Sequence, residues 1–426
     1  MFFERTFFSY AIPALKDVKN FKLIVAVALL FFNPLWEAPK NIFIVLAFFL
    51  VCSLAVNKDV PKLHKIDWVM LCLPPLVLLL SEVARYEGRP VSGMTEAMRC
   101  TVVFLFFGWF RWSAQEIRRI LLFAILATFI AGTIWFVNNY SQWLVNPNVA
   151  LLELGSVGHT NQSAIYINLI IGLLLAVLLS SSIKTILSKS IIFILLIVMV
   201  FFLFMTLSKI SIGVAVLMLS LSLFFLIYRY GRLYALLIGV LFLFGVGVSF
   251  SLVDNSLSRE FAMLSDSNNL TSFRLELFRS AFLAWLYHPI VGWGPDNFIL
   301  VNEEFVRNAA IEVYGFYSPE DYHFSSHAHG LFQTHLAERG LLGIIWIFSL
   351  IFLWALFLWR SKPDAKSSEI YRMIWWGSFF VLVVNVLNGT FNTTLHHEHA
   401  ILSYSLLGLH LAQWRGDKAN SNLNFS

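Results

Sequence analysis

The sequence predicts an all-α polytopic membrane protein with about 12 transmembrane helices and a large helical loop between helices 9 and 10. Hydrophobic residues make up 58% of the 426 residues, whereas a soluble domain has about 45–50%. Charged residues make up only 13%, about half the usual share, and the mean hydropathy is +0.75. One polar segment, 254–339, interrupts this apolar chain, and it is the first place to look for chemistry.

Each transmembrane helix needs roughly 20 apolar residues, with about 17 as a practical minimum. Stretches that reach or approach this length lie at 22–37, 40–57, 66–82, 98–113, 117–138, 161–181, 190–207, 210–228, 233–253, 341–359, 370–388 and 399–414. The chain therefore divides into an N-terminal membrane region (1–253), a polar loop (254–340), three C-terminal spans (341–414) and a tail (415–426).

The distribution of Lys and Arg predicts the orientation of these spans. With the N-terminus in the cytoplasm, 20 of the 30 Lys and Arg fall in inner segments or flank them. Inner loops of membrane proteins carry this excess of positive charge. We therefore expect both termini in the cytoplasm and the long loop outside. In a bacterium with two membranes, that corresponds to a multi-pass inner-membrane protein whose loop faces the periplasm.

Two helices are expected in the long loop. Apolar residues recur at helical spacing over Thr271–Tyr287, and His288-Pro289 ends this helix because the residue before a proline avoids helical geometry. Gly292 and Gly294 then favour turns. A second helix is expected from Ser326 to Glu338, with Gly340 as its C-terminal stop.

Several classes of function find no support in the sequence. No P-loop, dinucleotide fingerprint or nucleic-acid-binding stripe is present, so we expect no nucleic-acid partner. The three cysteines, Cys52, Cys72 and Cys100, lie in hydrophobic stretches and are interpreted as small core residues rather than a disulfide or metal framework. The first 20 residues lack the pattern of a cleavable signal.

His329 is the candidate catalytic residue of the loop. The unperturbed pKa of histidine lies closest to neutrality, so an imidazole can take a proton from a sugar hydroxyl. Gln333 follows one helical turn later and could bind a sugar or orient the imidazole. His327 is a further possible substrate contact. The alternative is an ordinary polar loop histidine.

Arg274 and Lys209 are candidate phosphate-binding residues. An arginine at a helix start, beside free backbone N–H groups, can form a phosphate site, and Lys209 is a charge between two hydrophobic spans. Arg99, at the outer end of the fourth span, could receive a lipid phosphate. The alternatives are a solvated charge at Arg274 and snorkelling at Lys209 and Arg99.

Two clusters near the outer ends of spans have simpler interpretations. For Arg85 and Arg89, with Glu82, Glu87 and Glu96 in the same segment, local charge pairing is expected. The string His396-His397-Glu398-His399 contains zinc-ligand types but matches no helical zinc motif. Adjacent residues in a regular helix or strand cannot all point at one ion, so we expect no metal there. A polar outer cap that helps to bind an anionic head group is preferred.

These motifs resemble the bacterial O-antigen ligase and polymerase superfamily, which also contains O-linked protein oligosaccharyltransferases. Its loop shows an arginine before a Trp-containing helix and a His-Pro-x-x-Gly-x-Gly-x-x-x-Phe run, here Arg274, Trp285 and His288 to Phe298. A histidine follows, then Gly-x-x-Gly after a fixed spacing, here His329 and Gly340 to Gly343. The chain departs from the pattern at Gly330, usually a polar residue, and at Ser208-Lys209, where the family has Ser-Arg.

The resemblance, closest to the ligase, implies an inverting glycosyltransferase that needs no cofactor. Its donor would be a glycan on undecaprenyl diphosphate, and its acceptor lipid A–core, both held among membrane lipids. Arg274 and Lys209 would bind the diphosphate and His329 would act as general base. The alternatives are an O-antigen polymerase, an O-linked protein oligosaccharyltransferase with the same donor, and a polysaccharide transporter. Transport is disfavoured because the polar residues gather at one face and not along a path through the membrane.

Overall fold

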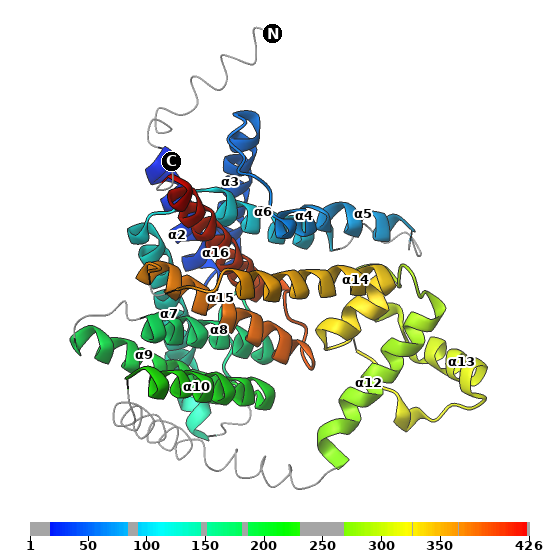
Figure 1. Ribbon diagram of the computed structural model, residues 1–426. Helices are drawn as coiled ribbons and strands as arrows, with labels where there is room; N and C mark the ends of the chain where they lie inside the picture. Colours follow the sequence, from blue (N-terminus) through cyan, green and yellow to red (C-terminus); the bar gives the residue numbers. More distant parts are fainter. Residues whose placement is uncertain are drawn as a thin grey trace.

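The computed structural model describes residues 18–83, 93–145, 151–180, 186–230, 268–325, 327–364 and 366–423, and these residues fold into helices (Figure 1). Seven helices of this described part are long and apolar enough to cross a membrane, and two shorter apolar ones accompany them. The predicted fold class, an all-α polytopic membrane protein, is confirmed.

The helices coincide with the expected spans. The span expected at 66–82 consists of two helices, α4 and α5, separated at Cys72, and the one expected at 233–253 lies outside the described residues. The helices outside the long loop are α2 (Val18–Phe32), α3 (Glu37–Val56), α4 (Lys65–Leu71), α5 (Leu73–Val83), α6 (Met94–Trp109), α7 (Ala114–Val145), α8 (Thr160–Ser180), α9 (Ile186–Met205), α10 (Lys209–Tyr230), α14 (Leu331–Arg360), α15 (Glu369–Gly389) and α16 (His397–Leu423).

The centre of the bundle is α8, which is buried along almost its whole length. It packs mainly against α15, and α9 and α10 cover its other side, while α16 packs against α6. Large apolar side chains on the outer helices remain exposed, among them Phe49 (62%), Ile194 (58%) and Phe352 (64%). A soluble protein rarely leaves so much apolar surface in contact with water, so these side chains mark the faces that contact lipid.

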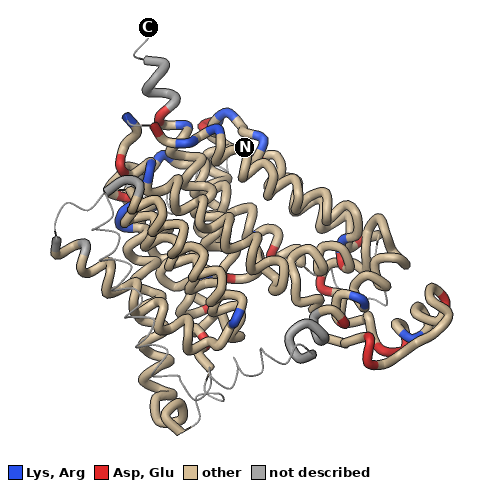
Figure 2. The backbone as a smooth tube through the Cα atoms, turned by 60° about the horizontal axis from the view of Figure 1, so that its bottom comes forward, with Lys and Arg blue, Asp and Glu red and all other residues tan. Residues whose placement is uncertain are grey.

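Basic residues gather at one end of the bundle, as Figure 2 shows. Arg415 forms an ion pair with Asp67 and donates to the backbone oxygens of Gly108 and Lys62. Lys22 pairs with Glu116 at 3.4 Å. The described basic residues named here, Arg415 and Lys22, belong to segments expected on the inner side, which agrees with the expected topology.

The long loop forms a folded lobe beside the other end of the bundle (Figure 1). It contains α12 (Asn268–Tyr287), η2 (Phe298–Leu300), α13 (Glu303–Tyr314) and η3 (Pro319–Asp321). The lobe has its own hydrophobic core, formed by Leu277, Ala281, Leu283, Ala284, Phe298, Val301, Val306, Ala309, Ala310, Ala328 and Ala337. The first expected helix is therefore present, and it begins slightly earlier than Thr271.

The two glycine-containing motifs of the loop interlock through their backbones. Helix α14 breaks at Gly340, which has φ 56° and ψ −151°. The carbonyls of Ala337 and Glu338 accept hydrogen bonds from the N–H groups of Trp293 and Gly294 at 2.9 and 2.8 Å. Beyond the break, the N–H of Leu341 donates to the carbonyl of Pro289 at 2.8 Å. The expected stop at Gly340 is therefore present, and the His-Pro segment satisfies the groups that the break exposes.

The second expected helix begins at Leu331, not at Ser326. His329 has a positive φ of 49°, and Gly330 is extended, with φ −153° and ψ 144°, at the N-cap. Neither conformation is helical, so this stretch of the sequence before Leu331 is a tight connection.

Candidate active site

His329 lies where the lobe joins the membrane bundle. Ala328 before it is buried in the core of the lobe, and Leu331 after it is buried in the core of the bundle. The Nε2 atom of His329 lies 3.0 Å from the Oγ atom of Ser325. Its positive φ of 49° is uncommon outside glycine. Packing on both sides, together with this hydrogen bond, therefore holds the imidazole in a defined position.

Gln333 connects the start of α14 to the turn after α15. Its Nε2 atom donates to the carbonyl of Thr390 at 3.2 Å. A Cβ atom placed on Gly330 would lie 1.9 Å from the Oε1 atom of Gln333. The amide of Gln333 thus fills the space in which the side chain of the usual polar residue would begin.

A layer of hydrogen bonds between side chains holds the turn that contains Lys209. The Ser208 hydroxyl donates to the Oδ1 atom of Asn161 at 2.9 Å, and the Ser211 hydroxyl donates to the Oδ1 atom of Asn388 at 2.8 Å. Asn388 lies near the end of α15, just before Thr390. Lys209 itself is exposed at the start of α10.

Arg274 lies in the first part of α12, in a helix that packs against α14. Its side chain is outside the described part of the chain. Arg279 on the same helix forms an exposed ion pair with Asp321. Arg279 thus has a partner within the lobe, and a direct contact of Arg274 with phosphate stays a prediction.

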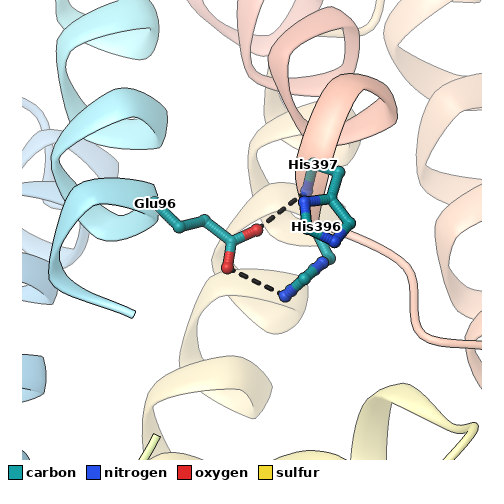
Figure 3. Close-up of side chains that lie close together, drawn as sticks. All are labelled: Glu96, His396 and His397. Atoms are coloured by element: carbon teal, nitrogen blue, oxygen red, sulfur yellow. Dashed lines mark hydrogen bonds and ion pairs between the residues drawn. The ribbon is translucent and has the colours of Figure 1, made fainter. Parts of the chain in front are cut away.

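Glu96, His396 and His397 form a second group of polar side chains (Figure 3). The Nε2 atom of His396 lies 2.9 Å from the Oε2 atom of Glu96, and the backbone N–H of His397 donates to its Oε1 atom at 2.8 Å. These three residues offer ligand-type atoms that all lie within 4.8 Å of one another. The expected local charge pairing is therefore wrong for Glu96, which reaches across to the turn between α15 and α16.

The histidine string divides between different partners. Glu398 points the other way and forms a buried ion pair with Lys40. His399 is fully buried, and its Nε2 atom accepts from the backbone N–H of His396 at 3.3 Å. The expected single polar cap is therefore not present at His396-His397-Glu398-His399, because these side chains point in different directions and contact different partners.

The charges in this group shift one another's pKa. Burial favours the neutral form of Glu96, but the charge and hydrogen bond of His396 outweigh it and hold the pKa of that carboxyl well below its usual value. Burial likewise opposes the charge on His396, yet Glu96 raises the pKa of that imidazole. Burial and then the charge of His396 lower the pKa of His397 to about 4. At neutral pH the carboxylate is ionised and His397 is neutral.

Two of the expected substrate-contact residues lie close to this group. Burial and then the charge of His396 lower the pKa of His327, with Asp296 and Glu96 opposing them. The charge of Arg99 acts on His397. The structure therefore places His327 and Arg99 near Glu96, His396 and His397. The motif spacing in the sequence did not predict that these residues lie together.

A small cavity of about 30 Å³ opens beside Glu96 and His396. Such a volume holds one or two water molecules. Among its lining residues are Thr334, His335 and Arg339 of α14 and Thr393 and Tyr404 of the C-terminal region. Arg339 was not a candidate in the sequence analysis, because it was counted only as one of the residues between His329 and Gly340.

The arrangement combines a positioned imidazole, several cations and a hydrogen-bonded polar layer at one end of a membrane bundle. Such groups can accept a proton from a hydroxyl and bind anionic phosphate.

Comparison with known proteins supports this chemical interpretation. Residues 194–348 match the family model described as O-antigen ligase. No curated protein matches the chain. The matched region contains the second part of α9, the whole of α10, the lobe and the first half of α14. It therefore includes Lys209, Arg274 and His329. The match indicates a glycosyltransferase-type enzyme, ligase or polymerase, that uses lipid-linked glycans in a membrane. Residues 194–348 are thus similar to the O-antigen ligase family, and this match supports the resemblance to the O-antigen ligase and polymerase superfamily.

Proposed function

We propose that this protein is an O-antigen ligase of the bacterial inner membrane. It transfers a glycan from undecaprenyl diphosphate to lipid A–core at the periplasmic face, as a step of lipopolysaccharide biosynthesis. The observation that carries the proposal is the position of His329, held by packing and by Ser325 where the lobe meets the membrane bundle, within the matched region.

The donor would bind with its lipid among the membrane helices and its diphosphate near the lobe. Arg274 and Lys209 supply positive charge to that diphosphate. A guanidinium offers a bidentate fork to phosphate, whereas an ammonium acts as a point charge. Stabilising the negative charge that develops on the leaving diphosphate lowers the barrier to transfer.

The reaction forms one glycosidic bond and breaks one sugar–phosphate bond. The acceptor hydroxyl attacks the anomeric carbon from the face opposite the diphosphate, which inverts the configuration of that carbon. Undecaprenyl diphosphate leaves with the bonding electron pair, and the imidazole of His329 takes the hydroxyl proton. Ser325, bonded to Nε2, orients the ring, while His327, Gln333 and Arg99 are placed to contact the sugars or the phosphates.

Matched variants test the roles of His329 and Arg274. We expect His329→Ala to reduce glycan transfer in vivo by about 10²–10⁴-fold, as loss of a general base does. His323→Ala, in the same lobe, is its control. Arg274→Ala should also abolish capped lipopolysaccharide, while Arg279→Ala should keep it, because the exposed pair with Asp321 contributes at most about 1 kcal/mol. Near-wild-type transfer by His329→Ala, at equal protein level, excludes its role as base.

The lipopolysaccharide gel profile of a deletion strain separates the candidate acceptors. For a ligase, all capped lipopolysaccharide is lost and lipid-linked polymer accumulates. Caps of a single repeat unit indicate a polymerase instead. An unchanged profile points to O-linked protein glycosylation or to another polysaccharide.

The ion pairs of the structure support an enzyme over a transporter. Lys22–Glu116 and Arg415–Asp67 belong to the end of the bundle where basic residues gather, and Lys40–Glu398 and Glu96–His396 to the opposite end. A transporter places charged residues along a path near the middle of the membrane.

A further inference from the structure

We propose that Glu96, His396 and His397 form a binding site for a zinc-like divalent metal ion at the outer end of the bundle. Their three ligand-type atoms lie within 4.8 Å of one another (Figure 3). Two histidines and one carboxylate are a donor set that binds Zn²⁺ with a fourth position open to water or another ligand. The inference concerns metal binding alone and does not rest on the proposed glycan transfer.

The distances need only a small adjustment to accommodate the ion. Donor atoms about 2.1 Å from a tetrahedral zinc ion are roughly 3.4 Å from one another. The Oε2 atom of Glu96 and the Nε2 atom of His396 are 2.9 Å apart, so they must separate slightly while the imidazole of His397 approaches. Rotation of side-chain torsions achieves this, since His397 is exposed.

The backbone conformation explains how two adjacent histidines reach one ion. Leu395 has φ 56° and His397 has φ 50°. In a regular helix or strand their imidazoles would diverge, but here the ring centroids of His396 and His397 lie 3.8 Å apart. The sequence-based argument against a metal thus assumed a regular backbone that this turn does not have.

Glu96 is oriented for binding by the same turn. Its Oε1 atom accepts the hydrogen bond from the backbone N–H of His397 at 2.8 Å, so its Oε2 atom is the one directed at His396. A carboxylate whose second oxygen is hydrogen-bonded keeps its orientation, as the outer partners of metal ligands do.

The surrounding charges are mixed. The charge of Asp296 acts on both His396 and His397 and adds to that of Glu96, while Arg99 acts on His397 and Arg339 on His396. The carboxylates of Glu96 and Asp296 favour a cation. The two imidazole ligands favour zinc over calcium or magnesium, which prefer oxygen ligands.

Occupation would tie α6 to the turn between α15 and α16. That turn contains Thr390, which contacts Gln333, and Thr393, whose Oγ1 atom lies 3.5 Å from that of Thr334 on α14. A bound ion would therefore brace the segment against which the start of α14 packs, and binding to the folded state should raise the apparent melting temperature.

Metal titration of the purified full-length chain tests the proposal. The chain carries an affinity tag without histidine, is reconstituted in nanodiscs and is stripped with a chelator. Zn²⁺ alone is then titrated against a chromophoric competitor. We expect one ion per chain, and binding at least about 100-fold weaker in Glu96→Gln and in His397→Ala, because even loss of an outer partner costs about 10–100-fold. His159→Ala, at an exposed histidine of the same outer end, should bind as the wild type does.

Co²⁺ spectroscopy of the wild-type chain gives a result that does not depend on whether the variants fold. A four-coordinate site of these ligands gives intense visible absorption, which Zn²⁺ should abolish at equal stoichiometry. Absence of that absorption, or Zn²⁺ binding that is equal in the wild type, Glu96→Gln and His397→Ala, would overturn the proposal.

Discussion

Lys209 is the residue at which this chain departs most clearly from the pattern it resembles. It keeps the positive charge of the family's arginine and loses the bidentate fork. The serine before it is held by Asn161, and the same polar layer continues through Ser211 to Asn388. The backbone of this turn is therefore positioned by three helices, and the side chain at 209 can vary without losing that support.

Substitutions at Lys209 test whether charge alone is sufficient. We expect Lys209→Met to reduce glycan transfer by about 10²–10³-fold, the usual cost of losing one group that stabilises developing negative charge. Lys209→Arg should retain or increase transfer, because the fork binds diphosphate in two places. The measurement is capped lipopolysaccharide in a deletion strain that expresses each variant. Full activity of Lys209→Met would remove this residue from the diphosphate site.

At the scale of elements, the break in α14 is the feature that places His329. The first half of α14 carries the lobe's Ala337, and the second half crosses the membrane. The segment from His288 to Gly294 fills the break with four backbone hydrogen bonds, from Trp293, Gly294, Leu341 and Leu342. The two glycine-containing motifs therefore pair with each other through their backbones at the break in α14. Their spacing is explained by this backbone geometry, without any catalytic role.

Gly340→Ala tests this joint. An added Cβ would lie 2.5 Å from the backbone of Ile290, and the φ of 56° with ψ of −151° suits glycine alone. We expect the free energy of unfolding to fall by about 1–3 kcal/mol or more. The measurement is the apparent melting temperature in detergent, which should decrease. Gly213→Ala in α10 is the control, because a Cβ there meets nothing within 4 Å and alanine favours a helix by about 0.5–1 kcal/mol. Equal melting temperatures for the two variants would contradict the role of Gly340.

At the scale of the whole molecule, charge separates the two ends of the bundle. Basic residues gather at one end, and the lobe lies towards the other (Figure 2). The positive-inside rule then predicts the basic end in the cytoplasm and the lobe in the periplasm. The candidate active site would thus face the side on which lipid-linked glycans are displayed.

Cysteine labelling tests this orientation. In a variant without Cys52, Cys72 and Cys100, a cysteine replaces either Phe316 in the lobe or Lys362 between α14 and α15. Both positions are exposed. A membrane-impermeant maleimide applied to spheroplasts should label the Phe316→Cys variant alone, and lysis should make the Lys362→Cys variant reactive. The reverse pattern would invert the proposed topology.

The hydrophobicity and charge of a residue do not depend on which residues it contacts in the fold. For that reason the sequence by itself determined the all-α membrane class, the positions of the described spans, the helix that ends at His288 and the stop at Gly340. Lys209, Arg274 and His329 were candidates from their side-chain chemistry, their position in the chain and the motif spacing, and they all lie in the region that matches the O-antigen ligase family model.

Only the tertiary structure decided which polar groups meet. Glu96 and His396 are about 300 residues apart, and no periodicity links them, so local pairing near Glu96 was the wrong expectation. The division of His396, His397 and Glu398 between opposite faces depends on positive φ at Leu395 and His397. Backbone conformations of that kind are imposed by packing, because isolated leucine and histidine residues avoid them. The candidate metal site therefore belongs to the fold and not to any segment of the sequence.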